Sequence, residues 1–414
     1  MSLGRILIAL SALALGAQSP VEQRLRTDLA YLTNPALRGR GQGTPGLEAA
    51  AQYLVESYRR MGLSASIQRY PVLARPQSGT LRHADPDLLA HSPNVVVVIP
   101  GSDPALAREY LALGAHFDHL GEDPGGLSLA LEGAKKCIHP GADDNASGTA
   151  LVLELARQLR EHPPRRSILL LHFSGEEVGL QGSAYWSKHA TVPLQQVKFF
   201  FNFDMVGRLD PRKPKLDIGG IGVSSAAMAL LDRHVPREIT LVHELGLNLG
   251  GSDHLSIAAE KIPSVFYFTG LHGNYHRPSD TLDKLNIAGE ALIEAAALGA
   301  IEEMADAQAS PAFDSDAARC LFPVGAKPTP PLGLLLGSPG PQATELGLQA
   351  GDILLSIQDQ PIRTLLDLAT AMEHHTPGDR VKVTWSRRGQ IKTAEILLKR
   401  RGTGTDNEPR IRKD

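Results

Sequence analysis

The sequence predicts an α/β fold with a mostly parallel, mixed sheet flanked by helices, followed by a small β-rich domain. Up to about residue 308, short apolar runs of strand length alternate with longer segments of helical spacing. This alternation is typical of α/β layer folds. The strand-like runs are apolar throughout, as expected for strands that are covered on both faces of a parallel sheet. A Pro-rich stretch follows, and after it short strand-like runs return.

The elements of the first domain are expected where the apolar spacing changes between the two periods. The expected helices are Val21–Leu32, Leu47–Met61, Ala146–Arg160, Ser224–His234 and Ile287–Ala305. The expected buried strands are Asn94–Pro100, Tyr110–Ala115, Arg166–Phe173, Lys198–Phe203 and Ile262–Phe268. In open α/β sheets, ligands bind at the carboxyl ends of the strands, so reactive side chains that follow these runs are the first candidates for a site.

The first 19 residues predict a secretory signal peptide. Arg5 precedes the apolar run Ile6–Leu15, and small residues follow it, which is the order that such peptides show. The run is too short to span a membrane in the mature chain, and no second run is long enough. Cleavage is expected after Ala17 or Ala14, and a buried or amphipathic helix is the alternative. The prediction implies an exported protein, periplasmic or extracellular.

Composition limits the classes of function. A chain of 414 residues is long enough for two or three domains, and a hydrophobic fraction of 42% supports a substantial core. The net charge of −3 and the lack of a long basic run argue against nucleic acid or an anionic membrane surface as partner. The two cysteines, Cys137 and Cys320, fall in different predicted segments and are both expected to be free.

Domain boundaries follow the change in composition. The first domain is expected over residues 20–308, a Pro-rich linker over 309–324, a compact second domain over 325–400 and a charged, disordered tail over 401–414. The second domain is expected to contain the strands Leu332–Leu336, Asp352–Gln358, Arg380–Trp385 and Thr393–Leu398 and the helix Thr364–His374.

Side chains of the types that bind metal ions occur in order along the first domain, several at predicted strand ends. The candidate ligands are His116, Asp143, Glu177, Asp204 and His276. Zinc binds His nitrogen and carboxylate oxygen, and a two-metal centre, with its ions roughly 3.5–4 Å apart, needs a carboxylate that both ions share. Five ligands with one shared give each ion three, and Asp143 is the expected shared ligand.

Two further carboxylates complete the predicted site. Glu176 adjoins a ligand and is expected to point elsewhere, free to act as general base on a water. Asp118 lies two residues after His116 and is expected to accept the other imidazole N–H. Each residue alone has a plainer explanation, because a lone His is usually structural and paired acids usually cap a helix or form a turn. His139, His172 and His272 are expected to be structural or exposed, His119 could lie at the edge of the site, and Arg38-Gly-Arg40 is expected to be a solvated loop.

Taken together, these motifs resemble one family. The matching segments are Ala115–His119, Pro140–Gly148, Phe173–Leu180, Asn202–Gly207, Ser252–His254 and Tyr275–Thr281. They are similar to the co-catalytic di-zinc exopeptidases of the peptidase M28 type, which include bacterial leucyl aminopeptidase and plasma glutamate carboxypeptidase. The resemblance covers about residues 25–305 and implies the zinc exopeptidase fold.

The resemblance implies the roles of individual residues. It implies two Zn²⁺ ions, one on Asp143, Glu177 and His276 and the other on His116, Asp143 and Asp204, with Glu176 as base. It implies a cis peptide after the bridging residue, expected at Asp143–Asp144, and a supporting role for Asp253 and His254. Some members carry a Tyr for the oxyanion where this chain has Leu249, so Tyr275 or the metal ions could take that role.

The second domain resembles a bacterial-type PDZ domain. The resemblance rests on Gly347–Ile357, on Pro361-Ile362 and on the following predicted helix. PDZ domains bind a peptide by adding it as a strand to a sheet edge, so a peptide ligand is implied here. A docked structural module is the alternative.

The predicted function is therefore an exported zinc aminopeptidase that hydrolyses N-terminal residues from peptides. A carboxypeptidase or dipeptidase would use the same motifs, because side chains outside the ligand set select the terminus of the substrate. A catalytically idle scaffold with a working PDZ domain is a third hypothesis, although such proteins usually lose ligands. Glutaminyl cyclisation with one zinc fits less well, because the ligands of a second ion are present.

Overall fold

The computed structural model describes residues 18–72, 84–122, 127–130, 134, 136–243 and 251–315, together with segments between 328 and 397. The chain divides into two compact units, residues 1–245 with 252–317, and residues 318–414 with 246–251. The expected signal peptide, the helix Thr364–His374, Leu249, Cys320 and the tail lie outside the described residues, apart from residues 18 and 19 of the signal peptide.

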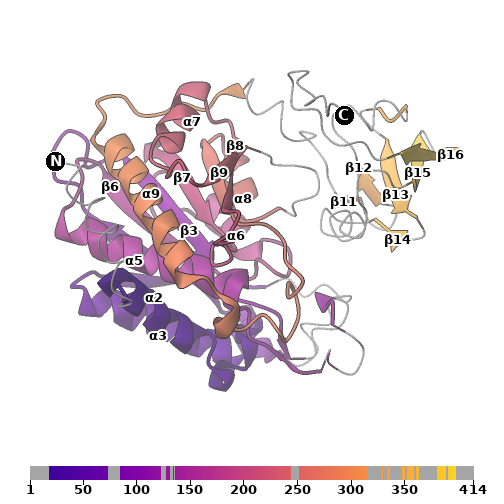
Figure 1. Ribbon diagram of the computed structural model, residues 1–414, viewed down its shortest axis with the longest axis horizontal. Helices are drawn as coiled ribbons and strands as arrows, with labels where there is room; N and C mark the ends of the chain where they lie inside the picture. The colour runs from indigo at the N-terminus through magenta and orange to yellow at the C-terminus, as the bar shows by residue number, and fades with distance from the viewer. Residues whose placement is uncertain are drawn as a thin grey trace, which may run out of the picture. The chain divides into compact units, whose positions relative to one another are not determined.

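An eight-stranded mixed sheet forms the centre of the first unit (Figure 1). In spatial order its strands are β1 (Ala65–Tyr70), β2 (Ser92–Ile99), β6 (Ser167–Phe173), β3 (Tyr110–His116), β7 (Val197–Phe203), β10 (Ser264–Phe268), β8 (Lys215–Ile221) and β9 (Thr240–Val242). The four central strands β6, β3, β7 and β10 are parallel to one another, while β1, β2 and β8 join the sheet by antiparallel pairing. The predicted α/β class and the mostly parallel, mixed sheet are confirmed.

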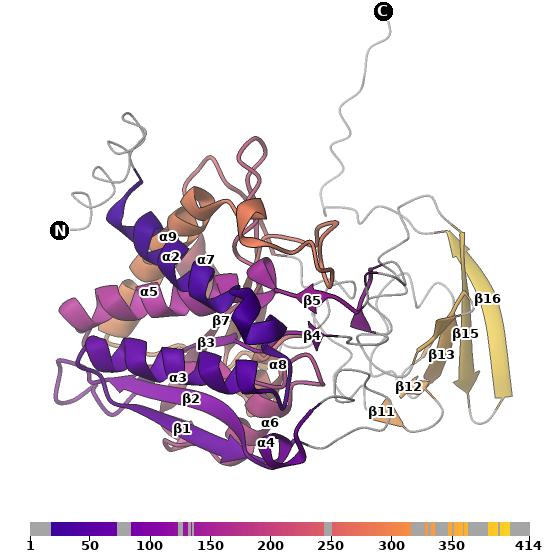
Figure 2. The ribbon, with the colours of Figure 1, turned by 90° about the horizontal axis from the view of Figure 1, so that it is seen from below.

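Helices cover both faces of this sheet because its central strands are apolar on both sides. Leu111 and Leu113 of β3 belong to the larger core, while Ala112 between them belongs to the smaller core on the other face. The helices that contribute to the larger core are α2 (Pro20–Leu32), α3 (Pro45–Arg60), α5 (Gly148–Glu161), α7 (Ser225–Asp232) and α9 (Ile287–Asp306). Figure 2 shows α3 lying along β1 and β2.

The smaller core is closed by two short helices, α6 (Gln181–Lys188) and α8 (His254–Ala258), which contact each other. Trp186 of α6, Ile257 of α8 and Phe200 of β7 are all fully buried in this core. The first unit also contains a short helix, α4 (Pro86–Ala90), and a π-helical turn over Ala142–Ser147. Neither α6 nor α8 was predicted, and neither were the strands β1, β8 and β9.

Helix starts follow the local sequence. Ser19 accepts a hydrogen bond from the N–H of Glu22, and Pro20 occupies the first helical position of α2. Thr44 and Pro45 repeat this arrangement at the start of α3. A capping hydroxyl satisfies a free N–H of the first turn, and the fixed φ of Pro suits that position, so these two starts are local properties of the chain.

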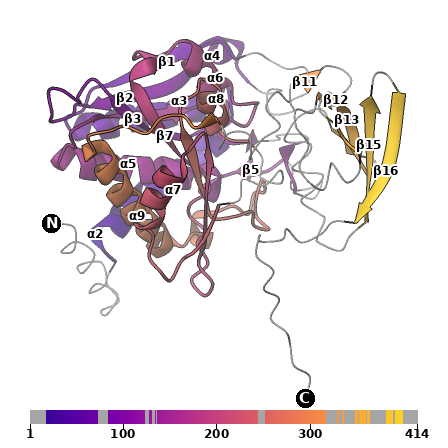
Figure 3. The same cartoon turned by 90° about the horizontal axis from the view of Figure 1, so that it is seen from above.

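The second unit contains a separate sheet of antiparallel strands, drawn in orange to yellow in Figure 3. Its strands are β11 (Pro328–Thr329), β12 (Gly333–Leu335), β13 (Ile353–Ile357), β14 (Gln360–Pro361), β15 (Arg380–Arg387) and β16 (Gln390–Leu397). The Arg387 guanidinium donates to Asp352 just before β13. No helix within the described segments of the chain is long and apolar enough to cross a membrane.

Candidate metal centre

The site forms where the carboxyl ends of the central parallel strands meet. His116 is the last residue of β3 and pairs with Phe173, the last residue of β6. Glu176 and Glu177 follow β6 after a short turn, and Asp204 directly follows β7. Because parallel strands end at the same edge of a sheet, residues distant in sequence come together there.

Two histidines face three carboxylates at this edge. His116 Nε2 lies 3.4 Å from Asp144 Oδ1 and 3.4 Å from Asp204 Oδ1. His276 Nε2 lies 3.2 Å from Asp144 Oδ2 and 3.2 Å from Glu177 Oε2. The two oxygens of one carboxylate, that of Asp144, therefore face one histidine each.

The second ring nitrogen of each histidine is held by the backbone. His116 Nδ1 lies 3.2 Å from the carbonyl oxygen of Asp118, and His276 Nδ1 lies 3.0 Å from that of Leu127. A carbonyl can only accept, so each Nδ1 carries a proton, and each Nε2 is the nitrogen left to bind a metal ion. This is the tautomer that a metal ligand needs.

The expected shared ligand, Asp143, does not lie between the histidines. Its Oδ1 accepts the N–H of Gly207 at 2.7 Å, and its Oδ2 lies 3.0 Å from His272 Nε2. The carboxylate that lies between the two histidines is that of Asp144, one residue later. The expected cis peptide shifts in the same way, because it joins Asp144 to Asn145 and not Asp143 to Asp144.

The loop that carries Asp144 is fixed against the end of β7. The Asn145 amide donates to the carbonyl of Phe203 at 3.0 Å, and its oxygen accepts the N–H groups of Met205 and Gly148. A side chain at Gly148 would place its Cβ 2.1 Å from the same Phe203 carbonyl. The close approach that glycine permits sets Asp144 beside Asp204, the residue after Phe203.

Asp280 connects the loop of His276 to the loop of Asp144. Its Oδ2 accepts the backbone N–H groups of Asp143 at 3.0 Å and Asp144 at 3.1 Å. Burial and the charge of Asp143 raise the pKa of Asp280 to about 6. Sequence reasoning gave Asp280 no role, although it belongs to one of the motifs that carry the resemblance.

Arg40 is fully buried, which contradicts the solvated loop that was expected for Arg38-Gly-Arg40. Its guanidinium donates to the carbonyl oxygens of Phe117 at 2.8 Å, Pro140 at 2.7 Å and Gly141 at 3.0 Å. It thereby joins the segment after His116 to the segment before Asp144. Burial lowers the pKa of Arg40 to about 10, although the negative charges of Asp118, Asp144 and Asp280 act to raise it.

Glu176 and Asp118 lie beside the histidine of β3. Ligand-type atoms of His116, Glu176 and Asp204 all lie within 4.8 Å of one another. The N–H of Glu176 donates to Asp118 Oδ1 at 3.3 Å, and that oxygen lies 3.5 Å from His116 Nδ1. Glu176 is more exposed than Glu177, so its carboxylate remains within reach of a molecule that enters the site.

His119 is part of the cluster and not merely near it. Its Nδ1 lies 2.7 Å from Glu177 Oε1 and 3.8 Å from Asp144 Oδ2, and the ring is buried. Tyr275 stacks on His276 with ring centroids 3.9 Å apart. Burial and the nearby carboxylates raise the pKa of Tyr275 well above its usual value, so its hydroxyl stays a hydrogen-bond donor.

The charges of the cluster perturb one another strongly. Burial alone would lower the pKa of His116, but Asp204 and Glu176 outweigh it and raise that pKa. Burial and Asp144 oppose ionisation of Glu177, yet His276 and His119 lower its pKa to about 2. For Glu176 burial dominates, and with the neighbouring carboxylates it raises the pKa well above the usual value.

The donor set fits a pair of divalent cations. Several carboxylates are buried together here, and positive charge beside them would offset their mutual repulsion. Asp204 Oδ1 is buried without a hydrogen-bond partner among the described residues, which is expected of an oxygen that faces an ion. Two His nitrogens and three carboxylates, one of them placed to be shared, form the mixed set that zinc accepts.

Comparison with known proteins gives two family matches. The profile of peptidase family M28 matches residues 94–301, and that of the PDZ domain matches residues 338–398. Aminopeptidase YwaD of Bacillus subtilis is 31% identical over 177 residues, which cover 40% of this chain and 38% of that protein. The uncharacterized protein YfbL of Escherichia coli is 26% identical over 298 residues, which cover 64% of this chain and 82% of that protein.

Most of the other matches cover only part of the relative's own length. A probable zinc metalloprotease of Pyrenophora tritici-repentis is 31% identical over 162 residues, or 34% of its own length, so this chain spans well under half of several curated relatives. Among solved structures, the zinc aminopeptidase BSAP from Bacillus subtilis matches with a TM-score of 0.55 at 17% identity, covering 72% of this chain and 99% of that chain. A leucine aminopeptidase precursor from Bacteroides thetaiotaomicron matches with a TM-score of 0.57 at 18% identity, covering 68% and 96%. These likenesses show the fold.

Proposed function

Because the chain belongs to peptidase family M28, we propose that it is an exported zinc-dependent exopeptidase, and specifically an aminopeptidase. The observation that carries the proposal is the position of Asp144, whose two oxygens face His116 and His276. The names of the relatives, among them an aminopeptidase and a probable zinc metalloprotease, support peptide hydrolysis. Export is supported by the pattern of the first 19 residues.

Two zinc ions would be held by this chain's own side chains. His116, Asp144 and Asp204 would hold one, and Asp144, Glu177 and His276 the other, with Asp144 shared. Bound there, the ions would polarise the scissile carbonyl group and lower the pKa of the attacking water. His119 would orient Glu177 through the contact of 2.7 Å, and the Asp118 carbonyl would orient His116.

Proton transfer is the role we assign to Glu176. Its carboxylate takes a proton from the attacking water and passes it to the nitrogen of the departing amine, as a general base and then a general acid. Burial raises the pKa of Glu176, and this direction favours a group that accepts a proton from water. Positive charge bound beside it would offset the repulsion from Glu177 and Asp204 that contributes to that shift.

Tyr275 is our candidate for a hydrogen bond to the oxyanion. It precedes His276 directly, its ring is held by stacking, and its hydroxyl stays protonated. A donor that is fixed in place before reaction stabilises developing negative charge at little reorganisation cost.

The experiment that tests this function is the release of chromophore from aminoacyl anilides by the full chain. Free-amino and N-blocked anilides are compared before chelation, after chelation and after zinc is restored. We expect cleavage of the free-amino set alone, lost on chelation and regained with zinc. If zinc-loaded protein cleaves neither set but cleaves peptides from the carboxyl end, the aminopeptidase assignment is wrong and a carboxypeptidase takes its place.

For the second unit we propose a peptide ligand, which the PDZ match supports. This surface would be separate from the hydrolytic site in sequence, and hydrolysis of short anilides should not require it. Fluorescence titration with a library of labelled peptides would detect such binding, and a library without any binder would favour a structural module.

A further inference from the structure

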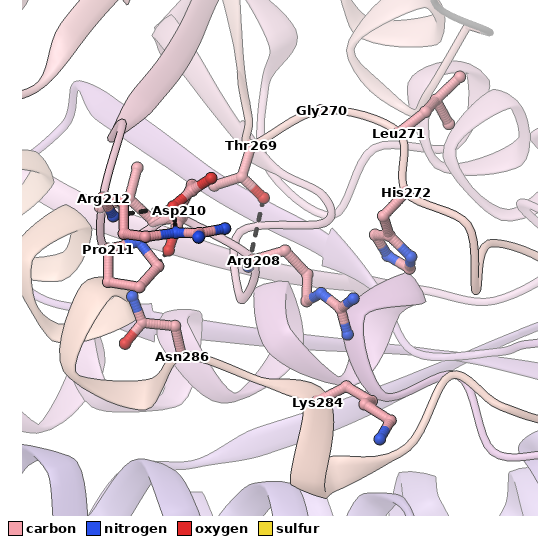
Figure 4. A pocket seen from close by; sticks show the side chains of 11 residues that line it. Arg208, Asp210, Pro211, Arg212, Thr269, Gly270, Leu271, His272, Lys284 and Asn286 are labelled. Atoms are coloured by element: carbon pink, nitrogen blue, oxygen red, sulfur yellow. Dashed lines mark hydrogen bonds and ion pairs between the residues drawn. The ribbon is translucent and has the colours of Figure 1, made fainter.

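A cationic recess lies beside the candidate metal centre. The loops that follow β7 and β10 and the turn before α9 enclose a cavity of about 340 Å³ (Figure 4). We call it the cationic recess and define it by Arg208, Arg212, Thr269, His272 and Lys284. Asp210 is the only carboxylate among the described residues that line it.

Arg208 is the side chain with the least compensated charge. Its Nη2 donates to Asn274 Oδ1 at 3.0 Å, but its Nη1 is buried without a hydrogen-bond partner among the described residues. No ion pair of Arg208 with a described carboxylate is found. A buried guanidinium N–H without an acceptor is costly, so the Arg208 guanidinium would gain a partner by turning toward an acceptor that a ligand brings.

The other two cations, Lys284 and Arg212, are more exposed. Lys284 is 48% exposed and lies 2.9 Å from Asp283, which is 68% exposed. Arg212 is 90% exposed and lies 3.9 Å from Asp210. Exposed pairs of this kind are weak, so both cations can reorient toward an anion in the recess.

The recess shares its loops with the metal centre. Arg208 follows Asp204 by four residues, and His272 precedes His276 by four. Asp143 connects the two loops, because it accepts the Gly207 N–H and lies 3.0 Å from His272 Nε2. The loop that carries Asp144 therefore contacts the recess through the neighbouring residue Asp143.

We propose that the cationic recess binds a carboxylate of the peptide substrate and so sets the specificity of the enzyme. The carboxylate is either an acidic side chain beside the scissile bond or the terminal carboxylate of a short peptide. The planar fork of Arg208 matches a carboxylate through two hydrogen bonds, and Lys284 and Arg212 add positive charge at the entrance. This inference rests on the proposed function, since it names the substrate class of that site.

The first test measures anion binding without turnover. Glutarate is titrated calorimetrically into the zinc-loaded full chain and into three variants. Arg208→Met should weaken binding about tenfold or more, the loss expected for a charged hydrogen bond, and Lys284→Met about threefold. Arg237→Met, which removes an exposed cation outside the recess, should bind glutarate as the unaltered chain does. If Arg208→Met does not fold, glutarate is titrated into the double variant Arg212→Met/Lys284→Met, in which both exposed cations of the recess are removed, and that result tests the inference.

The second test separates the two sources of the carboxylate. Values of kcat/KM are compared for Glu and Leu anilides, and for a dipeptide with a free or an amidated carboxyl end. A preference of about tenfold for the Glu anilide, or for the free dipeptide, that disappears in Arg208→Met identifies the source. If no peptide is hydrolysed, the proposed function is wrong. The calorimetric result alone then shows whether the recess binds a carboxylate.

The inference is overturned if glutarate binds Arg208→Met and the unaltered chain equally, because the anion would then lie elsewhere, for example on the metal ions. It is also overturned if the unaltered chain hydrolyses the Leu anilide and the amidated dipeptide at least as well as their charged counterparts.

Discussion

At the scale of single residues, two adjacent aspartates have different surroundings and different expected roles. Asp144 faces both histidines, while Asp143 binds the Gly207 N–H and His272. Both are buried. Asp143 is therefore a residue that positions the loops, and Asp144 is the residue that two cations would share.

Metal content of matched variants tests this difference. In Asp144→Asn the shared carboxylate becomes a neutral amide, and we expect the chain to retain fewer than two zinc ions and to lose activity. In Asp143→Asn the side-chain oxygen can still accept from Gly207, so two ions should remain. Elemental analysis of both dialysed proteins provides the measurement, and two ions in Asp144→Asn with fewer in Asp143→Asn would reverse the assignment.

The kinds of side chain at the candidate centre were predictable from the sequence, but which aspartate of this pair faces both histidines was not. Spacing alone does not distinguish neighbouring acids, because the choice depends on contacts with Phe203, Gly207 and Asp280, which are distant in sequence. His119 was treated as peripheral for the same reason, since its partner Glu177 is 58 residues away. Arg40 was read as solvated because charged residues are seldom fully buried.

Glu176→Gln tests proton transfer. The amide keeps the size of the side chain but cannot accept a proton, so we expect kcat to fall by about 10²–10⁴-fold while zinc content and thermal stability stay unchanged. Initial rates on a free-amino anilide provide the measurement. A variant with full kcat would remove Glu176 from the mechanism.

At the scale of elements, the apolar central strands were predictable and the edges of the sheet were not. β3, β6, β7 and β10 are mostly apolar runs, and their predicted positions lie within two residues of the observed ones at each end. The edge strand β1 carries Ser66, Gln68 and Arg69, and β8 contains Gly219 and Gly220. Polar residues and glycine are depleted in strands, so pairing with neighbours and not local propensity forms these two elements.

The helix α9 contains a buried acid that makes stability depend on pH. Burial and the nearby Glu154 of α5 raise the pKa of Glu294 to about 8. The unfolded chain releases this proton near its ordinary pKa of about 4.3, whereas the folded chain keeps it up to about pH 8. Folding is therefore favoured most below the unfolded pKa, and stability is lost as the pH rises through this window.

Glu294→Gln should remove that dependence, because Gln resembles the protonated acid at every pH. We expect the variant to raise the Tm clearly at pH 8.5 and little at pH 5, measured by thermal denaturation at both values. Glu238→Gln, at an exposed position before β9, serves as the control and should not change the Tm. An equal shift at both pH values for Glu294→Gln would mean that the acid is ionised in the folded chain.

At the scale of the whole molecule, ion binding and folding of the first unit should be coupled. The presumed ligands come from β3, from the loop before α5 and from the segments after β6, β7 and β10, so bound ions would join parts that are distant in the chain. A ligand present at 100 times its Kd stabilises the state that binds it by about 2.7 kcal/mol. Calorimetry should show an upward shift of the Tm with zinc, and the Tm of Asp144→Asn should shift less.

We propose above that two ions sharing Asp144 carry out hydrolysis. The most direct measurement is a titration of metal-free protein with zinc while the hydrolysis of a free-amino anilide is followed. We expect activity to be absent without metal and to continue rising until two equivalents of zinc are bound. Full activity at one equivalent, or activity that chelation does not remove, would contradict it.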